Sequence, residues 1–285
     1  MKIYIIIPAY NEAAFIGKTL SSLAGQSLLP KKIVVVNDHS GDATGEIVDE
    51  FSRTHDFISQ VHLNTKVTTH SPGSKVIRAF NIGFKDLDED YDIICKFDAD
   101  LIFPEDYLEK ISSHFKSNPS AGMAGGFCTV LRDNRWVIEN LTGKDHIRGA
   151  LKAYRKKCFL EIGKLKEAMG WDTVDELLAR YHGWEIITDS TLLVKHLKPT
   201  GSSYSNKSGF KQGAAFYRLR YGARLTIIAS AKLAYFKKDL KLFRDYLGGY
   251  YRAKKEKQAF LVSEEEGRFI RKLRWRNIGN KFLLI

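Results

Sequence analysis

Residues 92–104 read DIICKFDADLIFP, in which an apolar run stops at residues 98–100 (DAD) and then resumes. Such a run is typical of a strand buried in a sheet. Similar runs at residues 2–7 (KIYIII) and 31–38 (KKIVVVND) alternate with segments of helical periodicity, such as residues 12–26. Strands that alternate with helices predict an α/β fold with an open, doubly wound, mostly parallel sheet.

Three short polar segments each follow one of these predicted strands directly: residues 8–12 (PAYNE), 37–40 (NDHS) and 98–100 (DAD). In an open α/β sheet, ligands bind at the carboxyl ends of the parallel strands. The three segments should therefore share one edge of the sheet and form a ligand site there. After residue 105 the pattern loosens, and AGMAGGF at residues 121–127 predicts a glycine-rich turn that leads into another strand.

Composition indicates a globular protein kept in a reducing, cytoplasmic setting. The chain has 285 residues, of which 44% are hydrophobic, enough for a sizeable core. Its three cysteines, Cys95, Cys128 and Cys158, are far apart and form no C-x-x-C pair, so neither a disulfide framework nor a zinc site is expected. The first apolar run is too short for a signal peptide, and we expect no transmembrane helix.

The net charge of +12 is concentrated near the C-terminus. Residues 206–285 hold 20 of the 45 Lys and Arg residues and 6 of the 33 Asp and Glu residues, a net charge of +14. Residues 1–205, with 25 basic and 27 acidic residues, have a net charge of −2. Any attraction to acidic partners is therefore expected from the C-terminal region alone.

The two carboxylates of the DAD segment suit a hard divalent cation, Mg²⁺ or Mn²⁺. A cation held by so few protein groups completes its shell with water and phosphate oxygens, which implies a diphosphate ligand. The alternative is a helix cap or a solvated turn. The first strand is followed by neither a G-x-G-x-x-G nor a G-x-x-x-x-G-K-[ST] motif, which argues against NAD, FAD and P-loop chemistry.

Four motifs resemble the family 2 glycosyltransferases of GT-A fold, in the family's order. They are IIIPAYNEAAFIGKTLSSL, IVVVNDHSGDATGEIV, GSKVIRAFNIGF and DIICKFDADLIFPEDYL, and the resemblance covers roughly residues 3–200. It implies a catalytic domain at residues 1–205, with a nucleotide-sugar half at about 1–104 and an acceptor half at about 105–205. Residues 206–285 would form a basic, aromatic, helical appendage.

The resemblance also implies roles for single residues. Asp38 matches the residue that contacts the nucleotide base, with Asn37 at a position where the family often has an acid. Asp98 matches the residue near the ribose, and Asp100 matches the metal ligand. His196 is expected to be a further metal ligand or phosphate contact, or else a structural residue. The remaining residues expected at the nucleotide are Pro8, Tyr10, Glu12, Lys75, Arg78 and Asn81.

Sugar transfer by this family mostly inverts the anomeric centre and needs one general base. The cation stabilises the charge that develops on the departing diphosphate. A carboxylate then takes the proton from the acceptor hydroxyl. The acidic segment WDTVDELLAR (171–180) is the candidate, with Asp172 favoured at the helix start and Asp175 second. The family's Glu-Asp pair is absent there, and the alternative is that Asp172 only caps the helix.

The basic region contains AYFKKDLKLFRDYLGGYY (234–251), which predicts one amphipathic helix. Phe236, Leu240, Phe243 and Leu247 would lie on one face, opposite the lysines. This pattern is typical of a helix that lies in a membrane surface, so one expectation is a peripheral membrane contact within residues 225–276. The alternatives are packing of that face on the catalytic domain and, with less support because no recognised module is present, nucleic-acid binding.

The sequence therefore predicts a metal-dependent, inverting glycosyltransferase. Its donor would be a UDP-, GDP- or dTDP-linked sugar, and its acceptor the hydroxyl of a glycan or lipid-linked glycan in cell-surface polysaccharide assembly. It would work in the cytoplasm at the inner face of the cell membrane. The alternatives are a protein of the same fold with a retaining or nucleotidyl-transfer reaction, and a basic lipid- or nucleic-acid-binding module with an inactive pocket.

Overall fold

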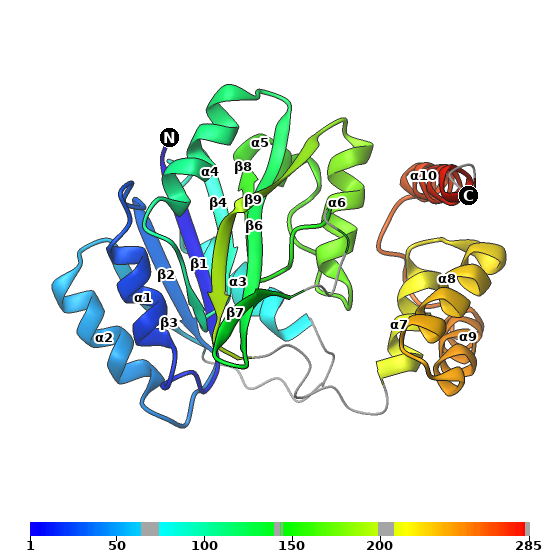
Figure 1. Ribbon diagram of the computed structural model, residues 1–285, viewed down its shortest axis with the longest axis horizontal. Coiled ribbons are helices and arrows are strands. Elements are labelled where there is room, and N and C mark those ends of the chain that lie inside the picture. The colour runs from blue at the N-terminus through cyan, green and yellow to red at the C-terminus, as the bar shows by residue number, and fades with distance from the viewer. Residues whose placement is uncertain (64–73, 140–142, 144, 199–207, 283–285) are drawn as a thin grey trace. The chain divides into compact units, whose positions relative to one another are not determined.

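The computed structural model describes residues 1–63, 74–139, 143, 145–198 and 208–282. The chain divides into two compact units (Figure 1). The first is formed by residues 1–167 and 171–200, and the second by residues 168–170 and 201–285. The domain boundary expected after residue 205 lies outside the described residues, so that assignment stays a prediction.

The first unit is built on one sheet with the strand order β3-β2-β1-β4-β8-β6-β9-β5, and β7 pairs with β6. Pairing is parallel from β3 to β4 and between β6 and β9, and antiparallel elsewhere. The expected α/β class is confirmed, with a mixed sheet. The strands are β1 (Ile3–Ala9), β2 (Lys32–Asn37), β3 (Ile58–His62), β4 (Ile93–Phe97), β5 (Leu101–Ile102), β6 (Ala121–Arg132), β7 (Arg135–Ile138), β8 (Leu151–Arg155) and β9 (Glu185–His196).

Helices cover both faces of this sheet (Figure 1). Phe97 of β4 packs against Tyr107, whereas Tyr154 of β8 packs against Phe159 on the opposite face. Side chains alternate along a strand, so Lys96 and Lys152 share the face that carries Tyr154. The helices of this unit are α1 (Ile16–Ala24), α2 (Thr44–Thr54), α3 (Ser74–Lys85), α4 (Tyr107–Ser117), α5 (Lys156–Glu161) and α6 (Trp171–Tyr181).

The glycine-rich stretch expected to be a turn is instead the beginning of β6. A Cβ atom at Gly122 would lie 2.6 Å from the Trp184 Cβ, and one at Gly126 would lie 2.2 Å from the Leu192 carbonyl oxygen. The glycines are therefore required by close packing in the middle of the sheet and do not mark a turn.

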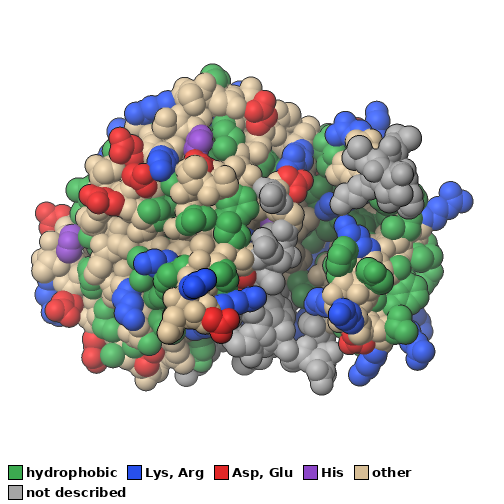
Figure 2. Space-filling model, viewed as in Figure 1, with side chains coloured by type: hydrophobic (Ala, Val, Ile, Leu, Met, Phe, Trp, Pro, Cys, Tyr) green, Lys and Arg blue, Asp and Glu red, His purple; other side chains and the backbone are tan. Residues whose placement is uncertain are grey.

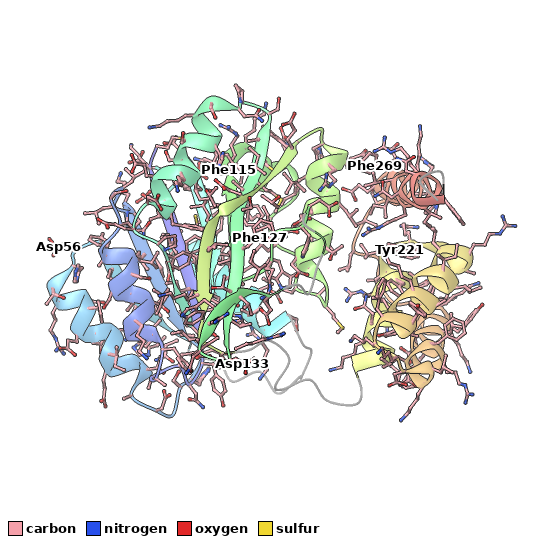
Figure 3. The ribbon with its side chains drawn as sticks, in the orientation of Figure 1. Asp56, Phe115, Phe127, Asp133, Tyr221 and Phe269 are labelled. Atoms are coloured by element: carbon pink, nitrogen blue, oxygen red, sulfur yellow. The ribbon has the colours of Figure 1, made fainter. Side chains whose placement is uncertain are left out.

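The second unit is helical, with α7 (Ser208–Arg218), α8 (Gly222–Phe236), α9 (Leu240–Lys255) and α10 (Glu264–Phe282). The backbones of α7 and α9 nearly touch: a Cβ atom at Gly213 would lie 1.9 Å from the Tyr246 carbonyl oxygen. Tyr221, labelled in Figure 3, stacks on Phe216 with a centroid separation of 5.2 Å. Among the described residues, none of the helices combines the length and apolar character needed to cross a bilayer.

The single amphipathic helix expected over residues 234–251 is wrong, because the chain turns between Phe236 and Leu240. The φ of Lys238 is 51°, which takes this residue out of the helical region. The Asp239 carboxylate then accepts a hydrogen bond from the Lys241 backbone N–H (2.8 Å) and begins a new helix as its N-cap.

Candidate active site

The loops after β1 and β2 are joined by hydrogen bonds at one edge of the sheet. The Asn11 backbone N–H donates to the Ser40 hydroxyl (3.0 Å), and the Gly41 N–H donates to the Asn11 side-chain oxygen (2.8 Å). Asn11 and His39 have φ values of 53° and 59°, in the left-handed region. Non-glycine residues in this region are uncommon and often occur at functional sites.

The DAD loop after β4 is fixed from α1. The Thr19 hydroxyl donates to the Ala99 carbonyl (2.8 Å) and accepts from the Leu101 N–H (3.0 Å). Because β4 pairs with β1 and β1 with β2, all three polar segments lie at the carboxyl ends of adjacent parallel strands. The charges of Asp98 and Asp100 act on Glu12 and contribute to its raised pKa, of which burial is the main cause.

The residues expected near the nucleotide base differ in exposure. Tyr10 is 60% exposed, whereas Pro8 is buried. Asp38 is about a quarter exposed, and its carboxylate contacts His39 Nδ1 at 3.1 Å. Glu12 accepts a hydrogen bond from Lys198, just beyond β9, at 2.6 Å. The loop after β1 is thus bonded to the segment that follows β9, the last strand of the sheet in sequence.

The side chains of Lys75, Arg78 and Asn81 all come from α3. Lys75 is exposed and Arg78 is half-buried. The Asn81 amide donates to the Glu167 carboxylate at 3.2 Å, so this side chain is bonded to the segment before α6. A nucleotide contact by these three residues stays a prediction.

Asp100 and His196 are brought together by pairing between β5 and β9. Leu101 is the register partner of His196, and Asp100 Oδ2 lies 3.3 Å from His196 Nε2. Both side chains are less than 10% exposed. Burial alone would lower the pKa of His196, but its hydrogen bond with Asp100 and the charge of Asp100 raise it. On the other side of the ring, His196 Nδ1 lies 3.5 Å from Glu139 Oε2.

Asp98 has a different partner. Its carboxylate pairs with the ammonium of Lys96, which is 2% exposed. Burial alone would raise the pKa of Asp98, but the charge and hydrogen bond of Lys96 lower it. Asp98 is therefore ionised and already neutralised by a protein cation. Of the two DAD carboxylates, Asp100 is the one that stands beside a second potential metal ligand.

The donor set fits a weakly held divalent cation. A carboxylate and an imidazole converge at Asp100 and His196. Carboxylates bind both Mg²⁺ and Mn²⁺, whereas an imidazole is a ligand for transition metals, so this pair suits Mn²⁺ better than Mg²⁺. Within the described part of the chain, no group of three or more His, Cys, Asp or Glu side chains is arranged to hold a metal. Such a pair would need water and phosphate oxygens to complete the coordination shell.

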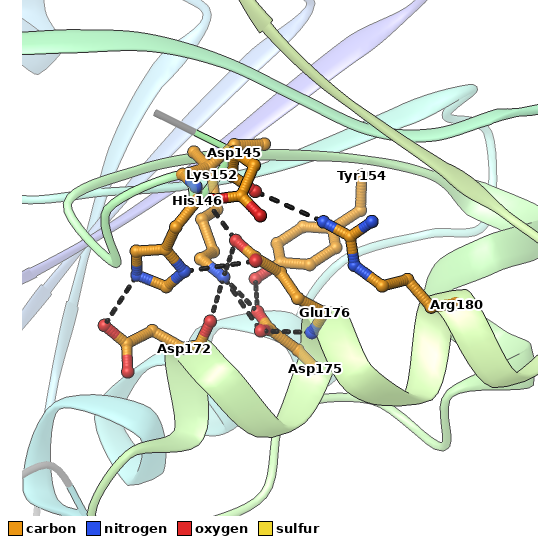
Figure 4. A network of polar contacts seen from close by, with 9 residues as sticks. Asp145, His146, Lys152, Tyr154, Asp172, Asp175, Glu176 and Arg180 are labelled. Carbon is orange, nitrogen blue, oxygen red and sulfur yellow. Dashed lines mark hydrogen bonds and ion pairs between the residues drawn. The ribbon is translucent and has the colours of Figure 1, made fainter. Parts of the chain in front are cut away.

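A second polar cluster surrounds the buried ammonium of Lys152 (Figure 4). It contacts both carboxylate oxygens of Asp175 (2.8 and 3.0 Å), the carboxylate of Glu176 (3.2 Å) and the backbone carbonyl of Asp172. The Tyr154 hydroxyl also donates to Asp175 (2.5 Å). Burial raises the pKa of Asp175 to about 7, against the opposing charge of Lys152. Asp175 is thus enclosed by donors and only 3% exposed.

Asp172 stands at the start of α6 with a third of its side chain exposed. His146 lies between two carboxylates, with Nε2 3.7 Å from Asp172 Oδ2 and Nδ1 3.1 Å from Glu176 Oε2 (Figure 4). Burial alone would lower the pKa of His146, but its bonds to Asp172 and Glu176 raise it to about 9. Burial alone would raise the pKa of Asp172, but the ion pair with His146 and the charge of Lys152 lower it. Asp172 is therefore an accessible, ionised carboxylate.

The two clusters meet at Trp171. Lys96 and Lys152 are register partners across β4 and β8, and their ammonium groups lie over the Trp171 ring, 5.4 and 5.7 Å from its centroid. Sequence reasoning missed both lysines and His146. A lysine in the middle of each of two apolar strands was a usable signal, because a buried lysine needs an acidic partner. His146 lies in a loop without any recognisable pattern.

Comparisons of sequence relate residues 4–163 of the chain to a family of glycosyltransferases. The sequence model of a family described as "Glycosyl transferase family 2" matches residues 4–163. The chain is 41% identical over 102 residues to "Probable glycosyltransferase YdaM" of Bacillus subtilis (strain 168), a match that covers 35% of this chain and 23% of that protein. It is 32% identical over 124 residues to "Poly-beta-1,6-N-acetyl-D-glucosamine synthase" of Staphylococcus epidermidis, covering 44% and 28%. These matches span roughly a quarter of each relative's length.

Solved structures show the same fold. TarS of S. aureus in complex with UDP-GlcNAc superposes with a TM-score of 0.59 at 18% identity, covering 97% of this chain and 79% of that one. The mannosyltransferase PcManGT from Pyrobaculum calidifontis, in complex with GDP-Man and Mn²⁺, gives a TM-score of 0.55 at 16% identity, with coverage of 100% and 81%. The expected GT-A fold is thereby confirmed.

Proposed function

The chain belongs to glycosyl transferase family 2, and we propose that it transfers a sugar with inversion from a nucleoside-diphosphate donor to the hydroxyl of a growing glycan. The observation that carries this proposal is the junction at Trp171. There the acidic loop after β4 and the acidic start of α6 are held next to each other by two neighbouring lysines. A diphosphate site and a base site must be adjacent for a direct displacement at the anomeric carbon.

The donor would be held by the loops at the sheet edge. We assign the nucleotide base to Asp38, with Pro8, Tyr10 and Glu12 around it, and the ribose to Asp98. Asp100 and His196 would hold a divalent cation, Mn²⁺ or Mg²⁺. When bound, such a cation stabilises the negative charge that develops on the diphosphate leaving group. The buried ammonium of Lys96 adds a fixed positive charge beside the same loop.

Asp172 is the better candidate for the general base. The Asp175 carboxylate already accepts from Lys152, Tyr154 and the backbone N–H of Glu176 (2.6 Å), so it has little capacity left for an acceptor proton. A third of the Asp172 side chain is exposed, and the ion pair with His146 helps to keep this carboxylate ionised. An ionised, accessible carboxylate is what proton abstraction from a hydroxyl requires.

The reaction we propose is a single displacement. The Asp172 carboxylate takes the hydroxyl proton of the acceptor while the acceptor oxygen forms a bond to the anomeric carbon. The bond from that carbon to the diphosphate oxygen breaks, and its electron pair stays on the diphosphate. Attack opposite to the leaving group inverts the anomeric configuration. His146 acts on Asp172 as a positioning residue.

UDP-GlcNAc is the first donor to test, because TarS binds it and the staphylococcal relatives are named as N-acetylglucosamine polymer synthases. GDP-mannose is the second, since PcManGT binds it with Mn²⁺. The acceptor we propose is a polysaccharide or a lipid-linked glycan on the cytoplasmic side of the membrane. Three buried, free cysteines are compatible with that reducing compartment.

The test is a donor panel of UDP-, GDP- and dTDP-sugars, scored by released nucleotide with and without Mn²⁺. We expect release from one donor, its loss in Asp172→Asn, and an inverted anomeric centre in the NMR spectrum of the product. A retained configuration would refute the displacement. If none of the donors raises the melting temperature and none releases nucleotide, the sugar-transfer proposal is refuted and a basic binding module is favoured.

A further inference from the structure

The turn between α8 and α9 exposes an unusual amount of apolar surface. We call residues 232–241 (KLAYFKKDLK) the α8–α9 corner. Tyr235, Phe236 and Leu240 are 79%, 69% and 82% exposed, and they are the three most exposed large hydrophobic side chains among the described residues. Isolated apolar side chains are common on protein surfaces, but three within six residues mark an interaction site.

Backbone hydrogen bonds define the conformation of the corner. The Asp239 N–H donates to the Ala234 carbonyl (3.1 Å) and the Lys238 N–H donates to the Tyr235 carbonyl (3.1 Å). This pair of bonds closes the end of α8 with Lys238 in the left-handed conformation, an arrangement that normally favours glycine. On the inner side, Ala234 and Tyr246 are almost fully buried. The three apolar side chains are thus held outward by a packed base.

Positive charge surrounds these side chains. Five basic residues lie within or just after the corner, and all are exposed: Lys232, Lys237, Lys238, Lys241 and Arg244. The one acidic residue, Asp239, uses its carboxylate to cap α9. Figure 2 shows basic and hydrophobic side chains interspersed over the C-terminal helices. The exposed apolar surface continues along α8 at Ile227 and Ile228.

We propose that the α8–α9 corner docks on an anionic lipid bilayer, with Tyr235, Phe236 and Leu240 entering the interface and the surrounding lysines on the lipid head groups. Tyrosine and phenylalanine side chains are favoured at the boundary between head groups and hydrocarbon. Each lysine near an anionic surface adds attraction. The bases of single-stranded nucleic acid stack on tyrosine and phenylalanine, but they would leave Leu240, the most exposed of the three side chains, in water. This docking is separate from sugar transfer.

The residues that we propose to contact the membrane differ from those expected for the single helix predicted from the sequence. A helix lying flat on the membrane would use Phe243 and Leu247 as well, but both are half-buried. Contact through the corner therefore predicts that substitutions at the turn abolish membrane binding. Substitution of exposed aromatic residues elsewhere on α9 should leave membrane binding unchanged. Tyr251, 52% exposed on the same helix, provides the matched control.

The experiment is co-sedimentation of the full chain with vesicles of phosphatidylcholine and phosphatidylglycerol, compared with vesicles of phosphatidylcholine alone. We expect wild-type binding only to the anionic vesicles, weakening with salt. Tyr235→Ser, Phe236→Ser and Leu240→Ser together should reduce the partition coefficient by at least about a hundredfold. Lys237→Gln and Lys238→Gln should each reduce it by about fivefold. Tyr251→Ser should leave it unchanged.

Three results would overturn the proposal. The first is wild-type protein that stays in the supernatant with anionic vesicles. The second is binding that survives the triple serine substitution. The third is a triple variant with a lower melting temperature or a changed oligomeric state without lipid, because the side chains would then be covered by this chain or by a second copy. Sedimentation requires no turnover, so its outcome is independent of whether the sugar-transfer proposal holds.

Discussion

Replacing His146 with glutamine tests the electrostatic link between the α6 cluster and the proposed base. The side chain of His146 is 15% exposed, and its pKa rises from 6.5 to about 9 in the folded protein. This rise corresponds to about 3 kcal/mol of extra stabilisation of the protonated ring in the folded state. Glutamine is similar in size but carries no charge, so His146→Gln should lose up to that amount.

The sign of the pH dependence follows from the raised pKa. The contribution of His146 is fully present below its unfolded pKa of 6.5 and is lost as the pH rises through about 9. The difference in unfolding free energy between wild type and His146→Gln should therefore be largest near pH 6 and vanish by roughly pH 10. Urea unfolding at a series of pH values measures this difference directly.

The same substitution should change the kinetics. His146 lowers the pKa of Asp172, so in the variant the acidic limb of the kcat/KM profile should move to higher pH. His182 directly follows the C-terminal end of α6, and His182→Gln is the control substitution. The reasoning is refuted if the stability difference is the same at every pH, or if the NMR titration of His146 in the wild type has its midpoint near 6.5.

Three further predictions concern the site and the helical unit. Asp172→Asn should lower kcat by about 10²- to 10⁴-fold and leave the donor affinity measured by calorimetry unchanged. Asp175→Asn should chiefly lower the melting temperature, because it removes the charged partner of the buried Lys152. Asp100→Ala should abolish the stabilisation by Mn²⁺ in a thermal-shift titration, measured relative to the variant's own melting temperature without metal, which should fall because His196 loses its partner. An unchanged Mn²⁺ response would remove this residue from the cation site. Gly213→Ala should destabilise the protein by about 1–3 kcal/mol in urea unfolding, because the alanine Cβ would overlap the Tyr246 carbonyl. The control Gly279→Ala, at a position with open space around it, should not lower the stability.

The three polar segments at the sheet edge could be predicted because each is adjacent in sequence to a strand that is itself recognisable. Each of the three polar segments directly follows an apolar strand, and parallel strands place such ends together. The pairing of Asp100 with His196 could not be predicted in the same way, although both residues lie at strand ends. Their proximity follows from a short antiparallel pairing of β5 with β9 that leaves little trace in sequence.

The cluster around Lys152 could not be predicted, because it joins residues from a loop, a strand and a helix. His146, Lys152 and Glu176 have no common periodicity, and their contact depends on how α6 packs on the sheet. The turn at Lys238 was missed for a different reason. Apolar residues at helical spacing continue through it and hide the helix start that Asp239, a good N-cap residue, provides.

The adjacent lysines in the middle of the sheet have a consequence for how the protein is made. Lys152 emerges from the ribosome before Asp175 and Glu176, the residues that neutralise it. Until these acids arrive, placing β8 beside β4 would bury an ammonium without a counterion, next to the ammonium of Lys96. We therefore expect β8 to pair with β4 only after α6 has been synthesised, because Asp175 and Glu176 on that helix neutralise Lys152.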